Sequence, residues 1–298
     1  MSSRAFAAAI EPVAGQVYFS PECHKAYTEM GFGGSPIALA EFGVPVGTTE
    51  TPDGPAYCCS RGSVLGQVPG EVIAAAFAAF NPANVIPAVT FGWTLTDAAT
   101  ICAARTAGAV AQLTRILGPS PNGLRRVHDL LERAGAQLRP ELRPMYAGLM
   151  SLPMPGDPIG DMWRLADRLR EYRGDSHNAA WAGAGLDATE INLLTELWWA
   201  LPLRSFSRSR GWSEDDLEAG IARLTERGLI AEGALTARGR ALREDIELAT
   251  DRQCRPIVDA VGDDLDELLD ILSGWNIEIR AAGGYLPSGP HDFARDAA

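Results

Sequence analysis

The sequence predicts a mainly α-helical fold with short β-hairpins, built from two similar halves. Three observations predict this class. Apolar residues recur at helical spacing in segments that end at glycine or proline. Short motifs repeat along the chain at offsets of 144 to 154 residues. Prolines crowd together between the two sets of motifs. With 298 residues, of which 46% are apolar and 21% charged, the chain can bury a large core and is not a disordered protein.

The internal repeat divides the chain. Three pairs of segments correspond: residues 21–26 with 174–179, 60–62 with 209–211, and 118 with 262. The offset falls along the chain, as expected for a duplication followed by loop deletions. We therefore predict a first repeat at residues 1–135, a proline-rich linker at 136–158, a second repeat at 159–280 and a C-terminal tail at 281–298.

The first half is predicted to hold a helix from Glu71 to Phe80. The longest uncharged stretch, residues 72–96, has the length of a membrane span, but Asn81, Pro82 and Pro87 interrupt it. We therefore expect a buried helix followed by a turn, and no membrane partner. The segment after this helix is apolar and broken by proline, so the first half has diverged more than the second.

The second half has clearer boundaries. Ser213 is a suitable N-cap for a helix that ends at Arg227, and Gly228 follows as its stop. A short hairpin around residues 232–233 comes next, and a long helix is expected from residue 235 to Asp251. A helix, a glycine stop, a short hairpin and a second helix form the order of a winged-helix module of the MarR kind.

Several segments resemble a helix-turn-helix family of high-GC Gram-positive bacteria: residues 170–180, 209–213 and 235–240, with 21–24 and 80–82 in the first half. The chain departs from that family at Trp181 and at Cys58-Cys59. The resemblance implies two tandem degenerate winged-helix repeats of the MarR kind that form a pseudo-dimer within one chain. It also implies that small molecules bind between the module and the helices that join the two halves.

His24 and His177 occupy corresponding positions in the repeat, so we expect two imidazoles to meet at one central cavity. The neighbouring candidate ligand-binding residues are Glu22, Tyr27, Asp175 and Trp181. Each histidine could instead pack and form hydrogen bonds at a helix junction. Metal or haem ligation is a further alternative, although no third ligand is fixed by spacing, and the cofactor stays unknown. The first functional hypothesis is a protein that binds a small apolar or aromatic molecule, as a sensor or as an enzyme derived from one.

Charge weakens the case for DNA, the other expected partner. The formal net charge is -12, and after Leu149 the chain carries 16 basic and 27 acidic residues. The predicted helix at residues 213–227 opens with three consecutive carboxylates. Arg204, Arg208 and Arg210 form a local basic cluster before it, and we expect them to pair with nearby acids in preference to phosphates. A DNA-binding transcriptional regulator is therefore the alternative function.

The cysteines and the N-terminal segment predict a cytoplasmic protein. Five cysteines lack the paired spacing of a disulfide framework or a zinc ribbon, which fits a reducing compartment. The apolar run at residues 5–10 is too short for a secretory signal.

Overall fold

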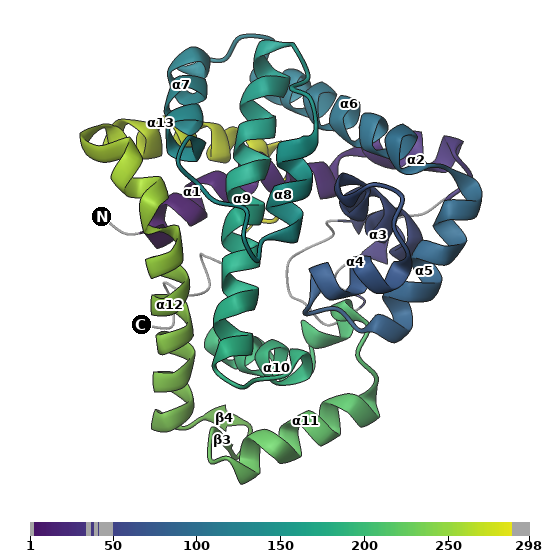
Figure 1. The fold of residues 1–298 in the computed structure, drawn as a ribbon, viewed down its shortest axis with the longest axis vertical. Coiled ribbons are helices and arrows are strands. Elements are labelled where there is room, and N and C mark those ends of the chain that lie inside the picture. The colour runs from purple at the N-terminus through teal and green to yellow at the C-terminus, as the bar shows by residue number, and fades with distance from the viewer. Residues whose placement is uncertain (1–2, 34–36, 39–40, 42–49, 288–298) are drawn as a thin grey trace.

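The computed structural model describes residues 3–33, 37–38, 41 and 50–287. The predicted mainly α-helical class is confirmed (Figure 1). The helices of the first half are α1 (Ser3–Gly15), α2 (Pro21–Glu29), α3 (Gly54–Gly62), α4 (Gly70–Phe77), α5 (Pro82–Leu95), α6 (Ala98–Leu117) and α7 (Leu124–Gly135). Those that follow are α8 (Pro144–Ser151), α9 (Pro158–Gly183), α10 (Ala188–Trp198), α11 (Glu214–Glu226), α12 (Ala237–Val261) and α13 (Leu265–Ala281). Strands β1 (Ile37–Ala38) and β2 (Glu50–Thr51) form one antiparallel pair, and β3 (Ile230–Ala231) and β4 (Ala234–Leu235) form another.

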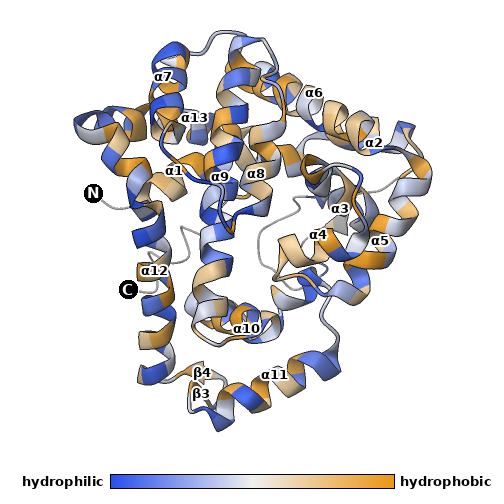
Figure 2. Cartoon of the chain, in the orientation of Figure 1, coloured by the Kyte–Doolittle hydropathy of each residue, from blue (hydrophilic) through white to orange (hydrophobic). Residues whose placement is uncertain are grey.

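The long helix α9 runs through the centre of the molecule. It packs against α1, α6, α7, α8 and α12, so both halves of the chain are built around it (Figure 1). Trp163, Ala166 and Leu169 bury its apolar side in the main core. Figure 2 shows hydrophilic residues along α9 and α12, and mainly hydrophobic ones along α4. A central helix with both apolar and charged faces can close the core on one side and line a polar cavity on another.

The first half differs from the winged-helix expectation. The predicted helix at residues 71–80 is α4, which ends at Phe77, and a turn follows it as expected. The place of a hairpin is taken by α5, because Asn81 caps that helix, Pro82 fits its first turn, and its apolar residues at helical spacing pack inward. The sheet of β1 and β2 lies before α3 instead. Among the described residues, no single helix is long and apolar enough to cross a membrane, although α5 and α6 together reach that length and composition across a 93° bend.

The second half follows the predicted order of helix, hairpin and helix. Ser213 and Asp216 cap α11 reciprocally, and Gly228 leaves the helix with a φ of 66°. The hairpin pairs Ile230 with Leu235, and α12 then extends ten residues beyond the predicted end at Asp251. Within the predicted linker, residues 144–151 form α8. Of the predicted tail, residues 288–298 lie outside the described part of the chain.

Candidate functional site: a cavity between the two halves

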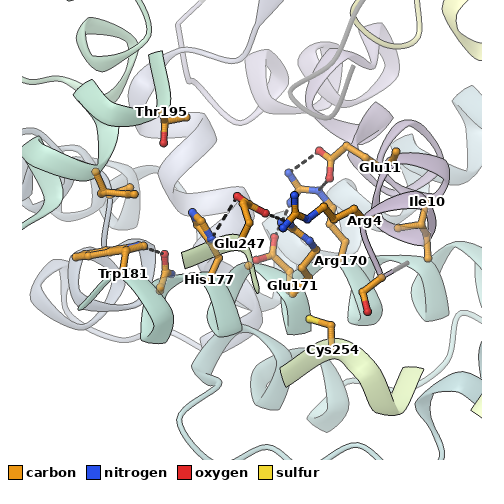
Figure 3. A pocket seen from close by; sticks show the side chains of 18 of the residues that line it. Arg4, Ile10, Glu11, Arg170, Glu171, His177, Trp181, Thr195, Glu247 and Cys254 are labelled. Atoms are coloured by element: carbon orange, nitrogen blue, oxygen red, sulfur yellow. Dashed lines mark hydrogen bonds and ion pairs between the residues drawn. The ribbon is translucent and has the colours of Figure 1, made fainter. Parts of the chain in front are cut away.

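A cavity of about 650 Å³ lies between residues of the first half and the helices α9, α10 and α12. Its size is within the range of small-molecule sites, roughly 300 to 1,000 Å³. Aromatic side chains line much of it: Tyr57, Phe77, Phe80, Trp181, Trp198, Trp199 and Phe206. Charged side chains line another part, and Figure 3 shows several of them. The cavity therefore combines apolar walls with fixed charges.

Glu171 on α9 stands at the centre of one charged group. Its carboxylate accepts hydrogen bonds from Arg61 Nη2 at 2.9 Å and from Arg170 Nη1 at 2.8 Å. Arg170 also donates to both carboxylate oxygens of Glu11, at 2.9 and 3.0 Å, and points toward it in Figure 3. Burial raises the pKa of Glu171, but the two arginines outweigh it and hold the pKa at about 2. This carboxylate is therefore ionised at neutral pH.

Glu247 on α12 organises a second charged group. It accepts hydrogen bonds from Arg173 at 2.9 Å and from Arg243 at 2.6 Å. His177 lies beside it, with Nδ1 at 4.0 Å from the Glu247 carboxylate and at 3.1 Å from Thr250 Oγ1. Figure 3 shows the His177 and Glu247 side chains pointing toward each other. Burial opposes ionisation of Glu247, but its two arginines and His177 lower its pKa well below the ordinary value.

Arg210 differs from the other arginines that line the cavity. Its guanidinium lies over the rings of Phe80 and Phe206, at 4.6 and 4.2 Å from the ring centroids. The described residues provide no carboxylate partner for it. Burial lowers its pKa to about 10, and the nearby charges of Arg61 and Arg170 act in the same direction. The guanidinium is still protonated at neutral pH.

The backbone around Arg210 is tied to the first half of the chain. Asn81 donates from its backbone nitrogen to Arg210 O at 2.9 Å and from Nδ2 to Gly211 O at 3.0 Å. Trp212 Nε1 donates to Ala79 O at 3.0 Å. Gly211 has a φ of 81°, which suits glycine, and lies two residues before the N-cap of α11. These hydrogen bonds therefore couple the position of the turn before α11 to the position of residues 79–81.

The structure separates the two histidines. His177 and Trp181 line the large cavity, whereas His24 and Tyr27 line another of about 270 Å³. The expectation that His24 and His177 share one cavity is therefore wrong. The physical reason is that α2 is short and packs on α6, while α9 is long and carries His177 toward α12. His24 Nε2 lies 3.1 Å from Tyr18 O, and burial lowers the pKa of His24.

Glu22 and Asp175 are placed outside the large cavity. Glu22 forms an ion pair with Arg115 at 2.6 Å. Asp175 is buried and accepts a hydrogen bond from the Tyr146 backbone nitrogen at 3.0 Å. Burial raises the pKa of Asp175 to about 7. The described residues contain no group of three or more side chains suited to holding a metal ion.

The three arginines considered for DNA binding, Arg204, Arg208 and Arg210, have different surroundings in the structure. Arg204 pairs with Glu214 and Glu218, and Arg208 pairs with Glu214 at 2.6 Å. The expectation that nearby acids neutralise this cluster is confirmed for Arg204 and Arg208. Arg210 instead lines the cavity.

Sequence reasoning missed the charged residues that line the cavity, chiefly Arg61, Glu171, Arg243 and Glu247. One signal could have found two of the cavity arginines. The two corresponding Ser-Arg-Gly segments place Arg61 and Arg210 at equivalent positions, and both side chains line this cavity. The repeated arginines, and not the repeated histidines, are the residues that the fold brings together.

Comparison with known proteins gives one result. A family model described as a helix-turn-helix family matches residues 3–287. No curated protein and no solved structure matches the chain.

Proposed function

Because this chain belongs to a helix-turn-helix family, we propose that it is a member that binds a small molecule in the cavity between its two halves. The observation that carries this proposal is the cavity itself, about 650 Å³ in volume, with aromatic walls and fixed charges. A few charged groups among apolar walls are typical of sites that orient a ligand. His177 and Trp181 are the residues predicted from the sequence that would contact it.

The position of the cavity supports a sensor in particular. A ligand would contact α10 on one side and the aromatic side chains of residues 57–80 on the other. Asn81 links that first-half segment to Arg210 and Gly211, directly before α11. A ligand that shifts the first-half wall would therefore shift the turn that leads into α11. An enzyme derived from such a sensor would use the same cavity.

Two fluorescent probes test the proposal: the anion 8-anilinonaphthalene-1-sulfonate and its uncharged counterpart N-phenyl-1-naphthylamine. At least one should bind the folded protein with one-to-one stoichiometry. Thr195 lines the cavity, so Thr195→Phe should fill part of it and weaken binding by roughly tenfold or more. Thr225 is exposed on α11, and Thr225→Phe is the matched control with unchanged binding. Absence of binding by both probes, or binding that ignores Thr195→Phe, would contradict the proposal.

A DNA-binding regulator is the second candidate. Family membership favours it, and so does the succession of α10, α11 and the β3–β4 hairpin, which is the order of a winged-helix module. The pairing of Arg204 and Arg208 with acidic side chains of α11 weakens it. Salt-dependent retention of duplex DNA by the purified protein tests this function.

A metal or haem enzyme is the third hypothesis, and it has less support. His24 and His177 line different cavities, so they are not positioned to ligate one metal ion together. Metal analysis and an absorption spectrum of the purified protein test it.

We also propose that the two halves are degenerate MarR-like winged-helix repeats arranged as a pseudo-dimer. Gly118 ends α6 with a φ of 82°, and Gly262 ends α12 with a φ of 62°. A further helix follows each of them, α7 or α13. At the offset of 144 residues that relates these two glycines, residues 98–135 should superpose on residues 242–279. We place the protein in the cytoplasm, where its five buried free cysteines would stay reduced.

A further inference from the structure

We propose that the cavity takes a small molecule with one negative charge, a carboxylate or comparable oxyanion, on an aromatic body, and that Arg210 binds the charge. This inference rests on the proposed function and adds the chemical class of the ligand. Three properties of the cavity carry it: the pairing of its arginines, the surroundings of Arg210, and the arrangement of its aromatic walls.

Most of the arginines that line the cavity have carboxylate partners among the described residues. Six arginines line it: Arg4, Arg61, Arg170, Arg173, Arg210 and Arg243. All except Arg210 pair with carboxylates of the described chain: Glu11, Glu171, Glu244, Glu247 and Asp251. Three of these carboxylates, Glu11, Glu171 and Glu247, line the cavity themselves, whereas Glu244 and Asp251 pair with Arg4 from outside its lining. Arg210 is the one lining arginine without a carboxylate partner among the described residues, and a ligand with one negative charge would supply that partner.

The Arg210 guanidinium has no counter-charge among the described residues. Its guanidinium lies over Phe80 and Phe206, and ring faces compensate only part of the hydration that a cation loses. Arg61 and Arg170 add positive potential at the same place. An anion bound here would be attracted electrostatically by all three arginines. A planar oxyanion could also accept two hydrogen bonds from Arg210. A second cation at this point would be repelled.

The aromatic side chains around the Arg210 guanidinium favour a ligand that contains an aromatic ring. Tyr57 and Phe77 lie near Phe80, with ring centroids 5.5 and 5.6 Å from it. Trp199 packs edge-on against Phe206 at 5.1 Å. These rings lie beside the two that contact Arg210, so an aromatic ligand could place its charge on the guanidinium and its rings against the wall. A small inorganic anion would leave this apolar surface unfilled.

The two probes of the proposed function also test the charge. They share the same aromatic body, but only 8-anilinonaphthalene-1-sulfonate carries a negative charge. The wild type should bind this anion more tightly than N-phenyl-1-naphthylamine. Arg210→Gln should lower the affinity for the anionic probe by about 10- to 100-fold, the range for losing a hydrogen bond to a charged group. The affinity for the uncharged probe should change little. Arg210→Lys keeps the charge and should retain most of the affinity.

Arg208→Gln is the control, because Arg208 is a neighbouring exposed arginine that pairs with Glu214 outside the cavity. It should leave both affinities unchanged. Thermal unfolding of each variant verifies that it is folded. If Arg210→Gln does not fold, the relative affinities of the two probes for the wild type and for Arg210→Lys still test the preference for the anion. Equal binding of the two probes, with no effect of Arg210→Gln, would overturn the inference while the proposed function stands. Absence of binding by both probes would overturn the proposed function and the inference together.

Discussion

Arg105 on α6 forms a two-point ion pair with Asp167 on α9, with nitrogen–oxygen distances of 2.8 and 3.1 Å. Both side chains are buried in the main core. The guanidinium also lies over the Trp163 ring at 5.0 Å and within 3.4 Å of the Tyr18 hydroxyl. This pair fixes α6 against the helix around which both halves are built.

Breaking this pair should destabilise the protein strongly. Arg105→Met leaves the Asp167 carboxylate buried without its counter-charge, which typically costs about 3 to 5 kcal/mol. The free energy of unfolding in urea measures this loss. The double variant Arg105→Met/Asp167→Leu removes both charges and should recover most of it. Arg255 forms an exposed pair with Asp259, so Arg255→Met is the control with little change. A small effect of Arg105→Met would show that water or another group reaches Asp167.

Asp175 should make stability fall as the pH rises toward neutral. Burial raises its pKa to about 7 in the folded protein, Glu171 acts in the same direction, and Arg61 and the Tyr146 backbone hydrogen bond act against it. Between the unfolded value of 3.8 and about 7, the folded state holds a proton that the unfolded chain releases. The stabilisation is therefore complete at low pH and lost by about pH 7.

Asp175→Asn tests this relationship, because an amide oxygen can still accept the Tyr146 hydrogen bond. The variant should be at least as stable as the wild type at about pH 8, and its advantage should shrink by about pH 5. Urea unfolding across this range measures both proteins. Asp129 is exposed, and Asp129→Asn should follow the wild type at every pH. A parallel pH dependence of Asp175→Asn and the wild type would show that Asp175 titrates normally.

Local structure in the second half was predictable because it depends on residues close in sequence. Ser213 and Gly228 bound α11 as predicted, since capping and a left-handed glycine act within one turn of a helix. The first half was harder to predict. Residues 81–96 contain two prolines, and their helix depends on the Asn81 cap and on packing against α3 and α4.

The cavity was only partly predictable, because its residues meet through tertiary packing. His177 and Trp181 were identified, but the repeat alone could not show that α2 and α9 differ in length and place their histidines apart. Arg61 and Glu171 are 110 positions apart, and no local pattern predicts their ion pair. A repeated residue marks equivalent positions in two copies, whereas sharing a cavity also requires that both copies keep the same helices.

Replacing His177 should weaken the binding of a probe in the large cavity, whereas replacing His24 should leave that binding unchanged. His177 lines the large cavity beside Glu247, so His177→Ala changes the wall that a ligand contacts. His24 lines the smaller cavity and is the matched control from the corresponding segment. Titration with the two naphthalene probes measures both variants. Each should lose about 1 to 3 kcal/mol of stability or less, the range for one buried polar partner. Equal losses of affinity in both variants would indicate a general effect on folding.

The acidic side chains of α11 should control any affinity for DNA. Glu214 and Glu218 hold Arg204, and Glu214 also holds Arg208, so the wild type should bind random duplex DNA weakly at physiological salt. Glu214→Gln/Glu218→Gln releases both arginines and removes two negative charges from the exposed face of α11. Fluorescence anisotropy with a labelled duplex should then show tighter binding and a steeper dependence on salt, because more phosphate contacts release more counterions. Glu278→Gln/Asp270→Asn removes two charges from α13 and should have little effect. Submicromolar, strongly salt-dependent binding by the wild type would instead identify a surface for phosphates that these ion pairs do not block, and would favour the DNA-binding regulator.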